Sequence, residues 1–234
     1  MSDDKRTIFQ AGLGASLLIA SAVLPATAGD TQLRQGLPGR RISGGTRSEC
    51  MAGSPPVVAL NPATNIGQTI SDRPSVYFVV PELEASYDLE FSLRDADGNR
   101  VYEKSLNTST DRGLVGIQLP EQALQTEQDY RWYFSIVCDA QDPTQNDVLS
   151  GWLRQVDVET IAENTVSLAA QDSVAEGLAA AQAYTAEGLW NDAIETLVSL
   201  REQHPDDASV RDSWHQLLQA LEIEAPMNIS VAAR

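Results

Sequence analysis

The sequence contains few of the residues from which catalytic and metal sites are built. Among its 234 residues are 2 His and 2 Cys. Two cysteines supply too few ligands for a four-thiolate zinc site and too few bridges for a disulfide-stapled mini-domain. His204 and His215 have no nucleophile or carboxylate in a recognisable triad order, and the common hydrolase, zinc-protease and nucleotide-binding motifs do not occur. We therefore expect a protein that is not an enzyme and that holds no metal or cofactor.

Basic residues are also scarce. The chain has 16 Lys and Arg against 33 Asp and Glu, which gives a formal net charge of −17. A surface that neutralises phosphates needs a basic face. The charge balance therefore argues against binding of nucleic acid and against docking on anionic lipid.

Long apolar runs are missing except at the N-terminus. The run at residues 11–24 is too short and too rich in Gly, Ala and Ser to form a stable membrane anchor. Lys5 and Arg6 precede it, and Pro25 and the cleavage pattern at residues 26–28 follow. We predict a signal peptide at residues 1–28 and an exported protein, periplasmic or extracellular, without a transmembrane segment after cleavage. An uncleaved anchor and twin-arginine export are the alternatives.

The two cysteines stand 88 positions apart, at Cys50 and Cys138. In an exported protein such a pair is expected to form a disulfide, which on the chain-entropy model stabilises the fold by up to about 4.5 kcal/mol. A redox or metal-binding pair is the alternative. No His lies near either residue in sequence, and neither belongs to a C-x-x-C motif.

Residues 29–49 are rich in Gly and hold four Arg against two acids. This composition predicts a flexible basic arm. The arm either lies solvated against its own acidic domain or docks on an acidic partner or polysaccharide. The candidate contacts for docking are Arg40, Arg41 and Arg47.

Residues 50–158 alternate between apolar and polar positions, as in half-buried strands. About seven short strands are separated by turn residues, and ten of the 14 aromatic side chains lie between Tyr77 and Trp152. This pattern predicts a two-sheet β sandwich. Leu124 stands six positions before Tyr130, which begins an alternating strand, as in the tyrosine corner of immunoglobulin and fibronectin type III domains. We therefore expect an immunoglobulin-like or fibronectin-III-like sandwich.

Residues 159–224 change to a helical period, and residues 225–234 are expected to form a flexible tail. The 34-residue window 174–207 fits one tetratricopeptide-like hairpin, and one further helix follows. A solenoid normally needs three repeats, so this hairpin must lean on the sandwich or on a partner. Tyr184, Trp190 and Trp214 are candidate partner contacts, although their helical spacing also fits a core.

The acidic run at residues 95–99 invites a calcium interpretation. An EF-hand loop would need a ligand at Leu93 and a Glu at Lys104, and both are absent. A hairpin turn with Gly98 at positive φ explains the run better.

Two segments carry a family resemblance. Residues 39–47 (GRRISGGTR), with Cys50 shortly after, and residues 130–139 (YRWYFSIVCD) resemble a cyanobacterial family catalogued as Domain of Unknown Function 928. Residues 151–152 and 188–193 (GLWNDA) fit it too. The resemblance covers roughly residues 36–223 and implies an exported cyanobacterial protein. It brings no activity, substrate or cofactor.

The function we expect is that of an exported, non-catalytic protein–protein interaction module whose partner is another envelope protein. This expectation rests on fold-level analogy, because both parts are scaffolds used mainly for binding. The alternative is a glycan-binding or carbohydrate-active surface protein, in which exposed Tyr77, Tyr102 or Tyr133 would stack on sugar rings.

Overall fold

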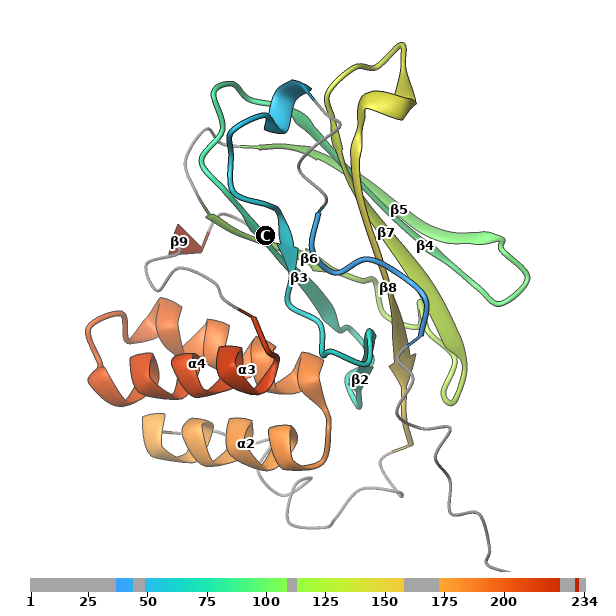
Figure 1. The fold of residues 1–234 in the computed structure, drawn as a ribbon. Helices are drawn as coiled ribbons and strands as arrows, with labels where there is room; N and C mark the ends of the chain where they lie inside the picture. Colours follow the sequence, from blue (N-terminus) through green and yellow to red (C-terminus); the bar gives the residue numbers. More distant parts are fainter. Residues whose placement is uncertain (1–36, 44–48, 109–112, 158–172, 224–229, 232–234) are drawn as a thin grey trace, which may run out of the picture. The chain divides into compact units, whose positions relative to one another are not determined.

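Two β-sheets and three helices make up the part of the chain that the structure, a computed structural model, describes (Figure 1). The described residues are 37–43, 49–108, 113–157, 173–223 and 230–231. They all belong to the second of two units of the chain, Met1–Leu33 and Arg34–Arg234. The expected order of a mostly β part followed by an α part is confirmed.

The strands divide into a four-stranded sheet with the order β1-β3-β6-β9 and a five-stranded sheet with the order β2-β8-β7-β4-β5. β2 is parallel to β8 and β9 is parallel to β6, whereas the other strand pairs are antiparallel. The strands are β1 (Val58–Ala59), β2 (Ile66–Thr69), β3 (Ser75–Val80), β4 (Asp88–Arg94), β5 (Arg100–Asn107), β6 (Gly113–Gln118), β7 (Asp129–Val137), β8 (Asp147–Gln155) and β9 (Ser230–Val231).

The five-stranded sheet has one buried face and one face toward solvent. In β7 buried residues alternate strictly with half-buried ones, so Trp132 and Phe134 point inward while Arg131 and Tyr133 point outward. Phe134 stacks on Phe78 of the opposite sheet with ring centroids 3.9 Å apart. The alternation recognised in the sequence is therefore the consequence of a sheet covered on one side only.

The four-stranded sheet is covered on both faces. All six residues of β3 are buried. Val76, Phe78 and Val80 belong to the core between the sheets, while Tyr77 and Val79 belong to a second core shared with the helices. Because both faces are covered, β3 is a continuous apolar run without alternation.

The helices form the layer on the outer face of the four-stranded sheet. They are α2 (Val174–Ala186), α3 (Trp190–Gln203) and α4 (Ala208–Ala220). The side chain of Ser173 caps α2, and that of Asp207 caps α4 by accepting from the Ser209 N–H at 2.8 Å. Gly188 has a φ of +77° and ends α2 with the left-handed residue that such a turn requires. The sequence left open whether the helices pack on the sandwich, and the second core answers that they do.

A short extended segment, residues 37–43, joins the edges of the two sheets. Arg40 exchanges two backbone hydrogen bonds with Ser150 of β8, at 2.8 and 2.9 Å. Two residues further on, Ile42 forms a bridge with Val58 of β1. These residues lie within the segment expected to be a flexible arm, and here their backbone pairs with both sheets.

Tyr130 makes the contact that its position in the sequence suggested. The backbone N–H of Gln125 donates to the phenol oxygen at 3.0 Å and ties the connection between β6 and β7 to the start of β7. The sequence did not predict β2 or β9, and it placed the start of the last sandwich strand at Trp152 instead of Asp147. Four residues including a Gly, as in β2, carry too weak a pattern to be recognised.

Candidate interaction site

In the described part of the chain, a groove with a volume of about 670 Å³ lies between α2 and α4. Leu197 of α3 contributes to its lining. The α2 wall presents Ala175, Leu178, Ala179, Gln182, Thr185 and Ala186, and the α4 wall presents Ser213, Gln216, Leu217 and Ala220.

The helical repeat explains why these residues share the groove. On α2 they recur at intervals of three and four residues, which places them on one stripe. A neighbouring stripe that includes Ala180 and Tyr184 is buried in the second core. α2 therefore carries two apolar stripes, one packed against other parts of this chain and one facing the groove.

None of the described residues that line the groove has a charged side chain. This is unusual in a chain of which 21% of the residues are charged. Exposed helix faces are normally charged or polar, whereas surfaces that bind a partner are depleted of charge at their centre. The groove therefore has the composition of a contact surface.

The three aromatic residues proposed from the sequence do not line this groove. Tyr184 is 5% exposed and Trp214 is 1% exposed, and both belong to the second core. Trp190 is partly buried against the same core. Their helical spacing, which fitted either a core or a contact surface, here corresponds to core positions.

The three arginines proposed from the sequence have different surroundings. The guanidinium of Arg41 donates to the backbone carbonyls of Leu221 and of Glu222 (3.3 Å) just beyond α4, and to that of Asn61 (3.1 Å). Arg40 has an exposed side chain. Arg47 lies outside the described residues. Arg41 thus satisfies carbonyls at the C-terminal end of α4, where a cation is favourable.

Polar contacts join α3 to the sandwich beside the second core. The Asn191 amide donates to the Ser75 carbonyl at 2.9 Å, and the Tyr77 hydroxyl donates to Glu195 at 2.7 Å. The Thr69 hydroxyl and the Ile70 N–H donate to the two carboxylate oxygens of Asp192, at 3.2 and 3.1 Å. Burial raises the pKa of Asp192 from 3.8 to about 6, and these hydrogen bonds only partly offset the rise.

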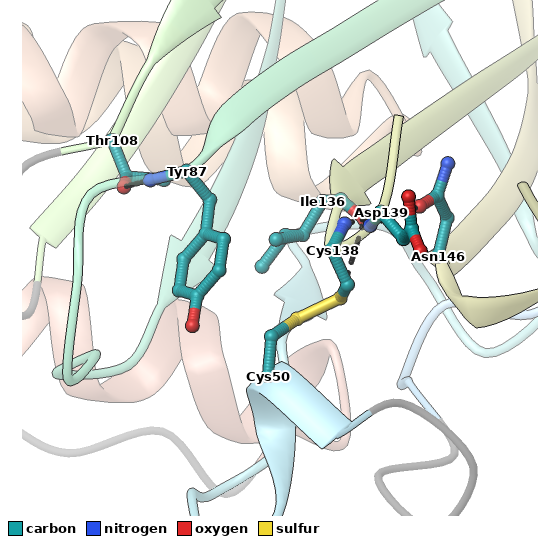
Figure 2. The surroundings of a disulfide bond; sticks show 7 residues. All are labelled: Cys50, Tyr87, Thr108, Ile136, Cys138, Asp139 and Asn146. Atoms are coloured by element: carbon teal, nitrogen blue, oxygen red, sulfur yellow. Dashed lines mark hydrogen bonds between the residues drawn. A yellow bond between two sulfur atoms is a disulfide. The ribbon is translucent and has the colours of Figure 1, made fainter. Parts of the chain in front are cut away.

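The disulfide is present between Cys50 and Cys138, whose Cα atoms are 5.6 Å apart (Figure 2). It connects the short 3-10 helix η2 (Glu49–Met51) to the end of β7. Asn146 follows the second 3-10 helix, η3 (Pro143–Gln145), and its side chain accepts from the backbone N–H of Cys138 at 3.0 Å.

The acidic run at residues 95–99 is a hairpin turn between β4 and β5. The Asn99 side-chain amide donates to Asp95 at 3.1 Å, and the backbone N–H groups of Asn99 and Asp97 donate to it at 2.8 and 3.0 Å. These hydrogen bonds lower the pKa of the Asp95 carboxyl. Gly98 has a φ of +84°. Across the described residues, no group of three or more His, Cys, Asp and Glu side chains is placed to hold a metal ion. No described helix is long and apolar enough to span a bilayer.

These features define a class of protein, a two-sheet β sandwich that carries helices on the outer face of one sheet and an uncharged groove between two of those helices. The chain belongs to the family described as Domain of Unknown Function (DUF928), whose model matches residues 42–231. No curated protein matches the chain.

The groove was missed in the sequence because its residues are small or neutral. Large aromatic side chains were named from the sequence as candidate contacts instead, and large apolar side chains are those most often buried in a core. A usable signal was present. α2 carries Ala or Leu at consecutive positions around most of its circumference, and a helix in the outermost layer of a protein normally shows one apolar stripe.

Proposed function

We propose that this protein is an exported, non-catalytic interaction module whose α2/α4 groove binds an apolar segment of another envelope protein. The observation that carries the proposal is that the described residues lining the groove are all uncharged, in a strongly acidic chain. An apolar segment would bury the Leu178 and Leu217 side chains, while Gln182 and Gln216 at the groove would supply hydrogen bonds.

The architecture supports a binding role by analogy. The order β1-β3-β6 in one sheet and β5-β4-β7-β8-β2 in the other, with β2 parallel to β8, fits an immunoglobulin-like sandwich, and Tyr130 fits the tyrosine corner. α4 begins at Ala208, 34 residues after α2 begins at Val174, as the first helix of a second tetratricopeptide-like repeat would. Both scaffolds present surfaces more often than they perform chemistry.

Export is part of the proposal. It is supported by the signal-like pattern at residues 1–28 and by the cysteine pair, because disulfides persist in oxidising compartments. A periplasmic or cell-surface location follows from export. A cyanobacterial source follows from the resemblance to the Domain of Unknown Function 928 family, and both are part of the proposal.

The test uses isosteric charge insertions at matched positions of the same helix. Gln216 lines the groove, and Gln219, three residues later, is exposed and does not. A photo-crosslinking residue at Ala179 in the exported protein is expected to capture an uncharged segment of one envelope protein, identified by mass spectrometry. Adding Gln182→Glu and Gln216→Glu should abolish this crosslink, and adding Gln219→Glu should leave it intact.

Two results would reject the groove as the binding surface. One is a crosslink that persists with both groove glutamates. The other is equal capture of the same segment when the photo-crosslinking residue replaces Gln219. Circular dichroism of each variant checks that the helices have formed.

A further inference from the structure

Three arginines lie side by side on the outer face of the five-stranded sheet. Arg131 of β7 is paired in register with Arg94 of β4, and Arg94 is paired with Arg100 of β5. On the other side of Arg131, the register partner on β8 is Trp152. We call Arg94, Arg100 and Arg131 the arginine row. It crosses three adjacent strands, which are spaced about 4.8 Å apart.

The arginine row is unfavourable for the protein on its own. Like charges directly opposite each other on neighbouring strands destabilise a sheet. A chain with twice as many acids as bases has ample carboxylates to place between them. A row of cations in this position therefore indicates that something other than folding requires it.

Two of these cations contact aromatic rings and not carboxylates, and Arg94 also donates to the Gly98 carbonyl at 3.0 Å. The Arg131 guanidinium lies 5.0 Å from the Tyr133 ring and 5.6 Å from the Trp152 ring, and Arg94 lies 5.8 Å from Tyr133. Arg100 bonds to Glu103. Within the described part of the chain, neither Arg94 nor Arg131 forms an ion pair, and the buried Nε of Arg131 has no hydrogen-bond partner.

Among the described residues, the acids of this face form no ion pair with Arg94 or Arg131, although Asp129 is the next outward-facing residue to Arg131 along β7. Asp88 and Glu90 occupy the opposite end of β4, and Asp129 is bonded to Arg154 at 2.7 Å. The Trp152 indole N–H donates to the Pro38 carbonyl at 2.8 Å, which fixes that ring beside Arg131. The result is a surface on which guanidinium groups lie beside aromatic rings, on a sheet whose other face is packed in the core.

We propose that the arginine row, with Tyr133 and Trp152, binds an acidic polysaccharide that carries one carboxylate per sugar ring. A guanidinium group presents its N–H fork to a planar carboxylate, and this pairing is bidentate. Ring faces next to the cations give the apolar side of a sugar a surface on which to stack.

The experiment measures binding of an oligogalacturonate to the exported protein by calorimetry, with the methyl-esterified oligomer as the uncharged probe. Arg94→Gln combined with Arg131→Gln should weaken binding at least tenfold. Arg73→Gln combined with Arg211→Gln removes the same charge from exposed positions elsewhere and should change binding less than twofold. Arg131→Lys keeps the charge but not the fork and should lie between these values.

Three outcomes would overturn the proposal. They are no binding of oligogalacturonate by the native protein, equal binding of the charged and esterified oligomers, or tighter binding of an oligothymidylate of equal length. Thermal melting of each variant confirms that it is folded. The groove variant Gln182→Glu/Gln216→Glu should bind oligogalacturonate as the native protein does, so the two sites can fail independently.

Discussion

The two sheets of this sandwich face different surroundings, and the difference separates the parts of the molecule that hold it together from those open to a ligand. The four-stranded sheet has the core between the sheets on one side and the helices on the other. The five-stranded sheet has the same core on one side and solvent on the other. β3 belongs to the first sheet and β7 to the second.

The helices are therefore a structural requirement of the sandwich as well as a binding surface. Without them, Tyr77 and Val79 of β3 and Leu114 of β6 would face water. An apolar patch of that kind on a monomer promotes association. The outer face of the five-stranded sheet carries polar and charged residues and needs no such cover. The arginine row on this face is therefore open to a ligand.

Truncating a side chain that packs between the two sheets should have the largest effect on stability. Phe78 is fully buried, and its ring stacks on Phe134 and meets Trp132 edge to face at 5.4 Å. Phe78→Ala should lower the free energy of unfolding by about 3–5 kcal/mol, because it leaves a cavity in the core. Urea denaturation measures the loss.

The matched change on the solvent face of the same region is Tyr133→Ala, which removes a half-buried ring. We expect a loss below about 1.5 kcal/mol, since no core cavity forms and only exposed cation–π contacts are lost. Equal losses for Phe78→Ala and Tyr133→Ala would contradict the distinction between the two faces.

The helix–sheet interface should respond to pH through Asp192. Its pKa in the folded protein, about 6, lies above the ordinary value of 3.8, so folding favours the protonated form. The stability that this group contributes is complete below pH 3.8 and is lost as the pH rises through about 6, which amounts to at most about 3 kcal/mol. Glu195, Tyr184 and Arg73 line the same small polar cavity.

Asp192→Asn should therefore stabilise the protein by about 1–2 kcal/mol at pH 7.5 and give little or no gain at pH 4. Urea denaturation at both pH values is the measurement, and Asp212→Asn, at an exposed position of α4, is the control. A gain of equal size at both pH values, or destabilisation at pH 7.5, would show that ionisation of Asp192 is not the cost that we infer.

The sequence shows which residues of β4 and β7 point inward more clearly than it does for β3, and the reason is physical. β4 and β7 alternate because solvent covers one face, so period two is visible along each strand. β3 was recognised as a strand, but its continuous burial reports two covering layers, and the sequence does not say what forms the second. The Cys50–Cys138 pair was predicted from compartment alone and is present.

The candidate sites could not be predicted, because both depend on which elements become neighbours. Arg94 and Arg131 are 37 positions apart in sequence, and only the pairing of β4 with β7 places them together. The register shift between Leu93 and Arg94 then aligns Arg100 with them. The groove likewise requires α4 to lie beside α2, and no single residue in either helix predicts that they are neighbours.

The smallest predicted effect concerns how the helices are fastened to the sheet edge. Arg41→Gln removes a guanidinium that donates to carbonyls beyond α4, and we expect a loss of about 1 kcal/mol, with faster amide exchange in the last turn of α4. Arg40→Gln is the control, because its side chain is exposed and its backbone bonds to Ser150 are unaffected. If both substitutions gave equal losses, the apolar core alone would hold the helices on the four-stranded sheet, and the link from the sheet edge to α4 would contribute nothing measurable.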